Sequence, residues 1–264
     1  MAGFDPRAAA ALEAHLFYMA ELTRGGGGTV VERDGALAFR ANQPPPFLIN
    51  GVARVDPAAA PASVLELGRD VFGERGYELV CLAGRDDDLC AAGIAAGMKA
   101  GGGADPLQRI ERRPAPAAAD TAGIEVRQVT DPAQLADVIA VNQDASDIYE
   151  IFPADFFANV FASPRTAIAP HLRVYVAYED GEPIATSEYA RYRDLCYIGW
   201  VAVVQRAMRR GLGHWITAHA VNAGFDDGVS AAVLLASPMG APLYRRMGFT
   251  DIGELSNVYA PGTG

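Results

Sequence analysis

The chain has 264 residues, a formal net charge of −10 and 50% apolar side chains. This composition is typical of a globular protein with a sizeable core, and the length predicts one large domain or two smaller ones. The acidic balance argues against a nucleic-acid-binding surface, because such surfaces need concentrated Lys and Arg. We therefore expect small molecules rather than nucleic acids as partners.

No apolar run reaches the roughly 18 residues that cross a bilayer, so no membrane association is expected. The first residues lack the basic-then-apolar pattern of a signal peptide, and we expect a cytoplasmic protein. Cys81, Cys90 and Cys196 show no Cys-x-x-Cys spacing. Neither a disulfide framework nor a zinc site is indicated, and the cysteines are interpreted as reduced core residues.

The first half of the chain predicts alternating helices and strands. Asp5 followed by Pro6 is typical of a helix start, and Asp34-Gly35 between two short apolar runs is typical of a hairpin turn. The predicted elements are a helix at 6–22, strands at 29–33, 36–40 and 47–55, a helix at 63–75, a strand at 77–83, a helix at 86–99 and a strand at 107–112.

The segment 114–123 has the composition of a linker, with no apolar periodicity, and we predict domains at 1–113 and 124–264. The fold class is α/β, of the α+β type. The elements predicted for the second domain are a strand at 124–129, a helix at 132–141, an irregular helical region at 146–161, a hairpin of 172–179 and 183–191, a strand at 197–204, a helix over 212–223, a strand at 231–236, a short helix at 241–247 and a strand at 249–258.

The stretch from Tyr197 to Ala220 predicts a strand, a tight loop and a helix in immediate succession. The loop is Arg209-Arg210-Gly211-Leu212-Gly213, in which glycines allow close backbone approach and two guanidiniums add positive charge. The first helical turn also presents unpaired amides, so the favoured ligand is a phosphorylated molecule. A dinucleotide fingerprint would need glycine at Ile216, and a P-loop would need Lys at His214, so both are rejected.

A second motif follows one helix later, at Leu243-Tyr244-Arg245-Arg246-Met247-Gly248-Phe249. The two motifs together resemble the GNAT N-acetyltransferase family, which has a Gln/Arg-x-x-Gly-x-Gly/Ala loop and a Leu-Tyr-x-x-x-Gly-Phe helix. The resemblance covers about 124–258. It implies a tandem arrangement of two GNAT-like domains, each with a mixed, mostly antiparallel sheet flanked by helices.

The first domain is interpreted as a degenerate GNAT-like copy of the second. Residues 50–55 and 199–203 are similar in sequence and occupy the same place in the order of elements, which an internal duplication would explain. After Val55, however, no glycine-rich basic loop follows. The first domain is therefore predicted to lack a phosphate-binding loop.

The resemblance implies acetyl-CoA as co-substrate, with backbone groups of Val201 and Val203 binding its pantetheine arm. It also implies that Tyr244 donates a proton to the leaving CoA thiolate. Ser237, where many members have Asn, belongs to the implied cofactor site, whereas Met208 replaces the usual Gln or Arg. The residues implied to hold the pyrophosphate through their amides are Arg209, Arg210, Gly211, Leu212, Gly213 and His214.

Direct transfer to an amine requires a base, and Glu188 is the candidate, with a solvent-facing structural glutamate as the alternative. Cys196 has no neighbouring His or Asp spacing and is interpreted as structural. His214 and His219 are five residues apart, which does not align ligands on a helix face, so no metal is expected. The acidic residues Asp144, Asp147, Glu150 and Asp155 are interpreted as a solvated face or as an attraction for a cationic acceptor.

The function expected from these patterns is an acetyl-CoA-dependent N-acetyltransferase that acts on a small-molecule or peptide amine by direct attack. The alternative is a non-catalytic acyl-CoA-binding sensor or scaffold module, which the departures at Met208 and Ser237 leave open. The acceptor, the acyl-chain preference and the oligomeric state, including a homodimer, are left open by the sequence.

Overall fold

The computed structural model describes residues 5–42, 49–117, 119–147, 155–161 and 163–262. By internal contacts the chain divides into a first unit, Met1–Leu107 with Asp251–Gly264, and a second unit, Gln108–Thr250. The contact-based division places the C-terminal strand with the first unit, whereas the sequence boundaries 1–113 and 124–264 assign it to the second.

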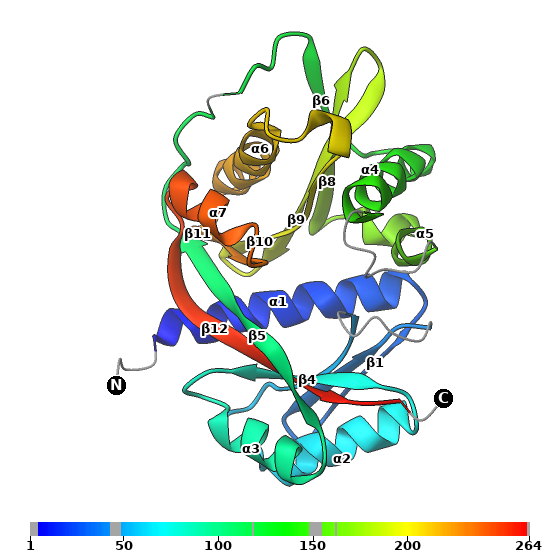
Figure 1. Cartoon of the computed structure of the whole chain (residues 1–264), viewed down its shortest axis with the longest axis vertical. Helices are drawn as coiled ribbons and strands as arrows, with labels where there is room; N and C mark the ends of the chain where they lie inside the picture. The colour runs from blue at the N-terminus through cyan, green and yellow to red at the C-terminus, as the bar shows by residue number, and fades with distance from the viewer. Residues whose placement is uncertain (1–4, 43–48, 118, 148–154, 162, 263–264) are drawn as a thin grey trace. The chain divides into compact units, whose positions relative to one another are not determined.

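The first unit is a sheet with helices on both faces (Figure 1). Its strand order is β1-β2-β3-β4-β12-β5, and β3 and β4 are parallel. The elements of this unit are α1 (Pro6–Gly25), β1 (Thr29–Arg33), β2 (Ala36–Arg40), β3 (Asn50–Arg54), α2 (Pro61–Phe72), β4 (Tyr77–Leu82), α3 (Asp87–Ala95), β5 (Lys99–Ile110, which continues into the second unit) and β12 (Thr250–Ala260).

Alternation along β4 distributes its side chains between the two faces. Leu79 and Cys81 belong to the apolar cluster that includes Val64 of α2 and Leu89 of α3. On the other face, a Cβ at Gly253 of β12 would lie 2.8 Å from Ala8 Cβ of α1 and 3.3 Å from Leu82 Cδ1. The helices α2 and α3 therefore cover one face, and α1 covers the other.

The second unit is a mixed sheet in which β10 and β11 are parallel and the remaining recorded pairs are antiparallel. Its strand order is β11-β10-β9-β8-β6, with β7 paired to β8. The elements of this unit are β6 (Ile124–Gln128), η2 (Pro132–Gln134), α4 (Leu135–Asp147), α5 (Phe156–Val160), η3 (Pro164–Thr166), β7 (Ile168–Ala169), β8 (Leu172–Glu179), β9 (Glu182–Tyr192), β10 (Leu195–Val203), η4 (Gln205–Ala207), α6 (Leu212–Asp226), β11 (Ala231–Leu235) and α7 (Ala241–Met247).

Alternate side chains of β9 contact helices on opposite faces of the sheet in the second unit. Thr186 accepts a hydrogen bond from Asn142 of α4 over 3.3 Å. Tyr189 points the other way, because a Cβ at Gly224 of α6 would lie 3.2 Å from its ring and 2.6 Å from Cys196 Sγ. The sheet therefore lies between α4 and α6 (Figure 1). The predicted α/β class with mostly antiparallel sheets flanked by helices is confirmed.

Local chemistry explains why most predicted elements are found. Asp34-Gly35 and Asp180-Gly181 form the two predicted hairpin turns, with positive φ at all four residues, as tight turns between twisted strands require. The helix predicted at 86–99 ends instead at Ala95, because Gly97 adopts a φ of 92°. The strand predicted to start at Leu107 begins at Lys99 in the structure. The prediction missed its first half because the Gly101–Gly103 run has little intrinsic strand preference.

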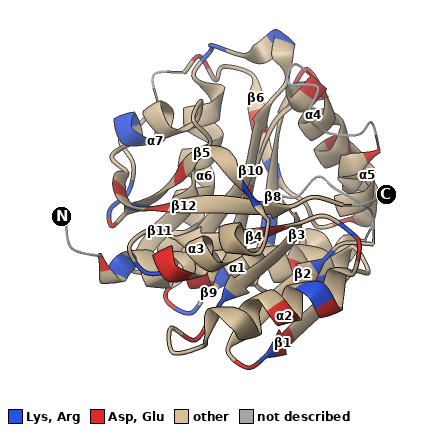
Figure 2. Ribbon diagram, turned by 60° about the horizontal axis from the view of Figure 1, so that its bottom comes forward, with Lys and Arg blue, Asp and Glu red and all other residues tan. Residues whose placement is uncertain are grey.

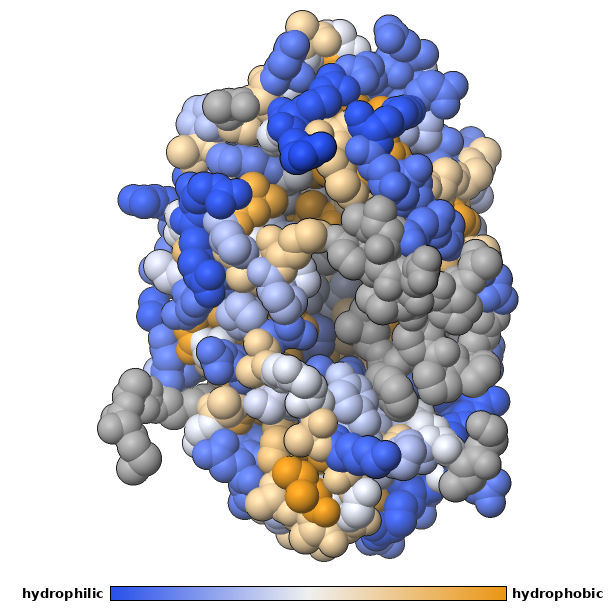
Figure 3. Space-filling view, viewed as in Figure 1, coloured by the Kyte–Doolittle hydropathy of each residue, from blue (hydrophilic) through white to orange (hydrophobic). Residues whose placement is uncertain are grey.

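The surface is mostly hydrophilic on the face shown in Figure 3, where hydrophobic atoms form small separate groups. The exposed large apolar side chains among the described residues are Ile94, Ile168 and Met239. No helix in the described part of the chain combines the length and the hydropathy needed to cross a membrane.

Candidate active site

In the second unit, β10 and β11 form a short parallel ladder and then separate. Leu195–Tyr197 lie opposite Ala231–Val233, whereas β10 continues to Val203 and stays paired with β9 on its other side. Beyond Tyr197, no ladder partner is found for the β11-facing edge of β10 in the described part of the chain. This edge, which includes Val201 and Val203, provides backbone groups for an extended ligand.

The loop between β10 and α6 has the backbone shape of an anion-binding nest. Arg209 has a φ of 62° and Gly211 has a φ of 83°, so two nearby residues are left-handed. Such turns gather successive amides on one side of the chain. Since α6 begins at Leu212 without a side-chain cap, its first amides also lack intrahelical partners. A phosphate group could be held by both sets of amides.

The loop, the short helix α7 and the end of β10 converge at Gly213. A Cβ placed there would lie 3.4 Å from Leu243 Cδ2 and 3.8 Å from Val203 Cγ2. Figure 1 shows α6 and α7 next to one another beside β10 and β11. The two sequence motifs, which are about thirty residues apart, therefore meet at one end of the separated strands.

The side chains of the loop contribute less positive charge than the sequence suggests. The Arg210 guanidinium donates to Glu179 over 2.9 Å, and this pair holds the pKa of Glu179 below its usual range. The His214 ring contacts the Ala115 carbonyl at 3.0 Å. Arg209 is exposed and has no ion pair among the described residues. Of the two arginines of the loop, Arg209 is therefore the one whose charge is not engaged by a carboxylate.

Tyr244 lies on α7, where burial raises the pKa of its phenol to about 12. Gly240 packs against its ring, since a Cβ there would lie 2.9 Å from Tyr244 Cε2. The Ser237 hydroxyl accepts from the Gly240 amide at 3.1 Å and fixes the turn before the helix. Arg245 and Arg246 occupy the last turn of α7 (Figure 2). The phenol stays protonated at neutral pH, as a proton donor must.

Glu188 is only 2% exposed, which excludes the alternative of a solvent-facing glutamate. It lies opposite Gly199 of β10. By alternation along β9 it shares a face with Thr186, the partner of Asn142 in α4. Glu188 is therefore buried on the α4 face of the sheet, beside a distortion in β10.

That distortion is a β-bulge at Trp200 and Val201, because Gly199 pairs with Glu188 but Ala202 pairs with Thr186. Trp200 has a φ of 40°, a strained value for a bulky residue. The Thr186 hydroxyl donates to the Trp200 carbonyl at 3.3 Å. No sequence pattern identified Trp200, because a bulge depends on the register between two strands.

The Trp200 side chain packs against the helix α5. Its ring centroid lies 6.0 Å from Phe156, 5.4 Å from Phe157 and 6.3 Å from Phe161. The indole N–H is buried and has no hydrogen-bond partner among the described residues. On the sheet face that α4 covers, an aromatic cluster and the unpartnered indole N–H of Trp200 therefore lie beside Glu188.

Two acidic residues of the irregular helical region, Asp144 and Asp147, have separate hydrogen-bond partners. The Asp144 carboxylate accepts from the Gln205 amide at 2.6 Å, and the Asp144 carbonyl accepts from the Gln205 side chain at 2.7 Å. Asp147 accepts from Gln143, and Glu150 lies outside the described residues. Asp144 thus connects α4 to the loop that follows β10, which is a structural role that the sequence analysis did not predict.

The structure supports the structural interpretation of Cys196. Its thiol is buried against α6, and burial raises its pKa to about 12. A thiol with such a pKa carries almost no thiolate at neutral pH and is a poor nucleophile. Among the described residues, no group of three His, Cys, Asp or Glu side chains is arranged to hold a metal ion.

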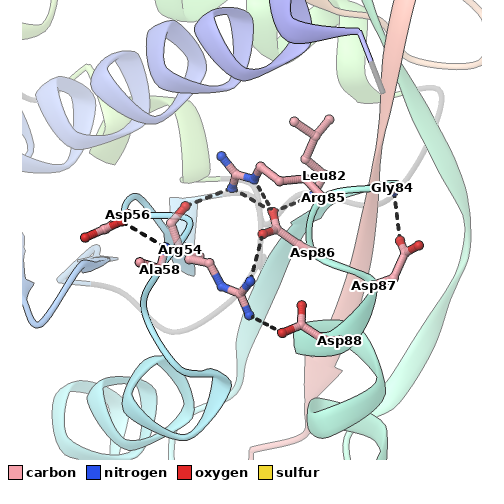
Figure 4. Close-up of polar contacts among 9 residues, drawn as sticks. All are labelled: Arg54, Asp56, Ala58, Leu82, Gly84, Arg85, Asp86, Asp87 and Asp88. Carbon is pink, nitrogen blue, oxygen red and sulfur yellow. Dashed lines mark hydrogen bonds and ion pairs between the residues drawn. The ribbon is translucent and has the colours of Figure 1, made fainter. Parts of the chain in front are cut away.

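The parallel strands β3 and β4 of the first unit end in an ionic network in which Arg54 and Asp86 are buried and Asp88 is exposed (Figure 4). Arg85 donates to the Arg54 carbonyl at 2.9 Å and to the Asp86 carboxylate at 2.6 Å. The same carboxylate accepts from the Leu82 amide at 3.0 Å. Arg54 in turn donates to Asp88 at 2.9 Å. Side chains of this unit therefore form hydrogen bonds with backbone groups at the ends of β3 and β4.

Comparisons with known proteins identify the family and the fold. The family model described as an acetyltransferase (GNAT) domain matches residues 108–242, just over half of the chain. The structure of a GCN5-related N-acetyltransferase from Kribbella flavida is 22% identical, with a TM-score of 0.70 over 99% of this chain and 97% of that chain. No curated protein gives a significant match.

Two further structures share the fold over most of their length. A conserved protein of unknown function from Staphylococcus epidermidis is 15% identical, with a TM-score of 0.61 over 89% of this chain and 94% of that chain. A tandem GNAT protein from the clavulanic acid biosynthesis pathway is 13% identical, with a TM-score of 0.59 over 97% of each chain. With the family match at 108–242, the chain belongs to the GNAT acetyltransferase family.

Proposed function

We propose that the protein is an N-acetyltransferase that transfers the acetyl group of acetyl-CoA to an amine. The observation that supports this function most strongly is the convergence of the separated β10, the nest at Arg209–Gly211 and the Tyr244 helix at Gly213. An extended edge followed by a concentration of amides suits a pantetheine arm followed by a pyrophosphate. Membership in the family supports the same assignment.

In this proposal the second unit holds acetyl-CoA mainly through its backbone. Val201 and Val203 bind the pantetheine arm. The pyrophosphate interacts with the amides of Arg209, Arg210, Gly211, Leu212, Gly213 and His214. Ser237 acts indirectly, by shaping the turn before α7 through Gly240. Backbone binding does not require the side chain that Met208 replaces, so this substitution is compatible with the function.

Bound acetyl-CoA supplies an activated acetyl thioester. Tyr244 donates its phenolic proton to the CoA sulfur as the carbon–sulfur bond breaks. Glu188 accepts, directly or through water, the proton that the acceptor nitrogen must lose. A buried carboxylate can serve as such a base because its environment controls its basicity. The acceptor then leaves as an N-acetyl product, and CoA leaves as the thiol.

The test is CoA release from acetyl-CoA with a panel of small amines and peptide N-termini. Tyr244→Phe retains the ring but lacks the proton donor, so we expect kcat to fall by about 10²–10⁴ with little change in acetyl-CoA binding. Tyr192→Phe, at the end of β9, is the matched control and should retain kcat. Equal kcat in Tyr244→Phe and wild type would remove Tyr244 from the mechanism.

The competing function is acyl-CoA binding without catalysis. Met208 and the engagement of Arg210 by Glu179 are the observations that favour it. Tight calorimetric binding of acetyl-CoA, together with background CoA release across the whole amine panel, would establish this alternative.

The first unit, as a degenerate copy, is proposed to bind no CoA. Arg85 and Asp86 engage the Arg54 carbonyl at the end of β3 and the Leu82 amide at the end of β4, whereas β10 has no described ladder partner on its β11-facing edge beyond Tyr197. We therefore expect one acetyl-CoA per chain. The stoichiometry is measured by calorimetry.

A further inference from the structure

Two cysteines of the first unit lie on neighbouring elements and differ in exposure. Cys81 is on β4 and is only 1% exposed, whereas Cys90 is on α3 and is partly exposed. Cys81 belongs to the apolar cluster between the sheet and α3, and Cys90 packs against that cluster. The acetyl-CoA site proposed in the second unit uses neither thiol.

The packing of α3 on β4 brings the two thiols together. A Cβ at Gly93 would lie 2.9 Å from Leu79 Cδ2, so the helix backbone approaches the strand closely. The chain reverses direction between β4 and α3, in the short turn at residues 83–86. Cys90 precedes Gly93 by three residues on one helix face, and Cys81 follows Leu79 by two residues on one strand face. This register places Cys90 over Cys81.

A hydrogen bond joins the two thiols and makes them chemically different. It lowers the pKa of Cys90 and raises that of Cys81, and burial raises the pKa of Cys81 further. Asp86, Asp87 and Asp88 at the start of α3 (Figure 4) oppose the fall in the pKa of Cys90 without cancelling it. Cys90 is therefore both the more acidic and the more accessible thiol, which are the properties of an attacking thiolate.

We propose that Cys90 and Cys81 form a peroxide-sensitive dithiol, in which Cys90 is oxidised first and Cys81 then closes a disulfide between α3 and β4. The oxidant is a hydroperoxide. A disulfide needs the two Cα atoms within about 7 Å of one another, and the close approach of α3 at Gly93 favours this distance. The site does not depend on the proposed acetyltransferase function.

The oxidation proceeds in two steps. The Cys90 thiolate attacks one oxygen of hydrogen peroxide, the O–O bond breaks, and the second oxygen takes a proton and leaves as water. Cys90 is then a sulfenic acid without the negative charge that held the proton on Cys81. The Cys81 sulfur attacks the sulfenic sulfur, so that the S–S bond forms, the S–O bond breaks and the hydroxyl leaves as water with the Cys81 proton. The two thiols lose two electrons in total, which the peroxide accepts.

The test is a tryptic peptide map of the full chain after treatment with hydrogen peroxide at neutral pH. Trypsin cleaves after Arg75, Arg85 and Lys99, so Cys81 and Cys90 fall on separate peptides, 76–85 and 86–99. We expect the two peptides to appear joined, with a mass about 2 Da below the sum of the thiol forms, and to separate on reduction. Joined peptides should form at least about tenfold more slowly in urea, where the packing of α3 on β4 is lost. Unjoined peptides in the folded chain, or equal rates with and without urea, would overturn the proposal.

Three variants test the order of the two steps. In Cys81→Ala the sulfenic acid on Cys90 has no thiol to resolve it and should be trapped by dimedone. In Cys90→Ala neither joined peptides nor a dimedone adduct on Cys81 should form. Cys196→Ala changes the buried thiol of the second unit, and this matched control should join the two peptides at the wild-type rate. A dimedone adduct on Cys81 in Cys90→Ala, with circular dichroism showing a folded chain, would contradict the assignment.

Discussion

At the scale of single residues, Glu78 and Glu188 are two buried carboxyl groups that sequence patterns did not distinguish from surface glutamates. Glu188 was selected for its place before the cofactor strand, whereas Glu78 was not identified at all. Both positions follow from strand alternation once the register of the sheet is known. Burial then changes what each group can do, since an ionised carboxylate is costly away from water.

The raised pKa of Glu78 has a consequence for stability. Its pKa is about 8 in the folded chain against 4.5 for an unperturbed group. The folded state therefore binds more protons than the unfolded state between these values, and the stability that Glu78 contributes is lost as pH rises through this range. For one group the loss is at most about 1.4 kcal/mol per pH unit.

Glu78→Gln should reduce the loss of unfolding free energy as the pH rises. Urea unfolding at a series of pH values between 5 and 8.5 measures it, with Glu74→Gln as the control that retains the wild-type slope. A wild-type slope in Glu78→Gln would mean that other groups control the pH dependence.

At the scale of elements, the loop from Arg209 to Gly213 shows how backbone conformation creates a binding site. Its motif was readable in the sequence, but the sequence could not show which arginine is free. The structure pairs Arg210 with Glu179 of β8, a contact between segments that the motif does not include. The amides, rather than the guanidiniums, are therefore expected to provide most of the phosphate binding.

Gly211→Asp tests this expectation, because it places a carboxylate where a pyrophosphate is proposed to bind. We expect acetyl-CoA affinity to fall about a hundredfold or more, as like charges repel in a partly buried site. Gly228→Asp is the matched control, since Gly228 has a similar φ of 81° just after α6 and open space around it. The two variants should lose similar stability, but only the first should lose binding in calorimetry. Equal affinities would exclude the loop as the phosphate site.

At the scale of the whole molecule, each unit depends on a strand that the sequence boundaries separate from it. Gln108 donates to the Ala241 carbonyl at the start of α7, and Ile110 lies in the core of the second unit. Residues 255–260, in contrast, pair with β4 of the first unit. Each of these two segments therefore contacts one unit although the sequence boundaries assign it to the other.

A fragment of residues 124–264 lacks Gln108 and Ile110 and retains a strand without its β4 partner. We expect it to lose cooperative urea unfolding, whereas residues 108–250 keep every strand of the second unit and should unfold cooperatively. Circular dichroism at 222 nm follows both transitions. Equally cooperative unfolding of the two fragments would show that the contact-based division does not describe the folding units.

The sequence by itself determined the local features of this protein, because turns, helix starts and glycine-rich loops depend on neighbouring residues. The Asp34-Gly35 and Asp180-Gly181 turns, the helix over Ala241–Met247 and the family resemblance were all readable in this way. The tertiary structure alone decided the strand register. Register produced the bulge at Trp200, the burial of Glu188 and Glu78, and the placement of the last strand, since each depends on pairing between segments distant in the chain.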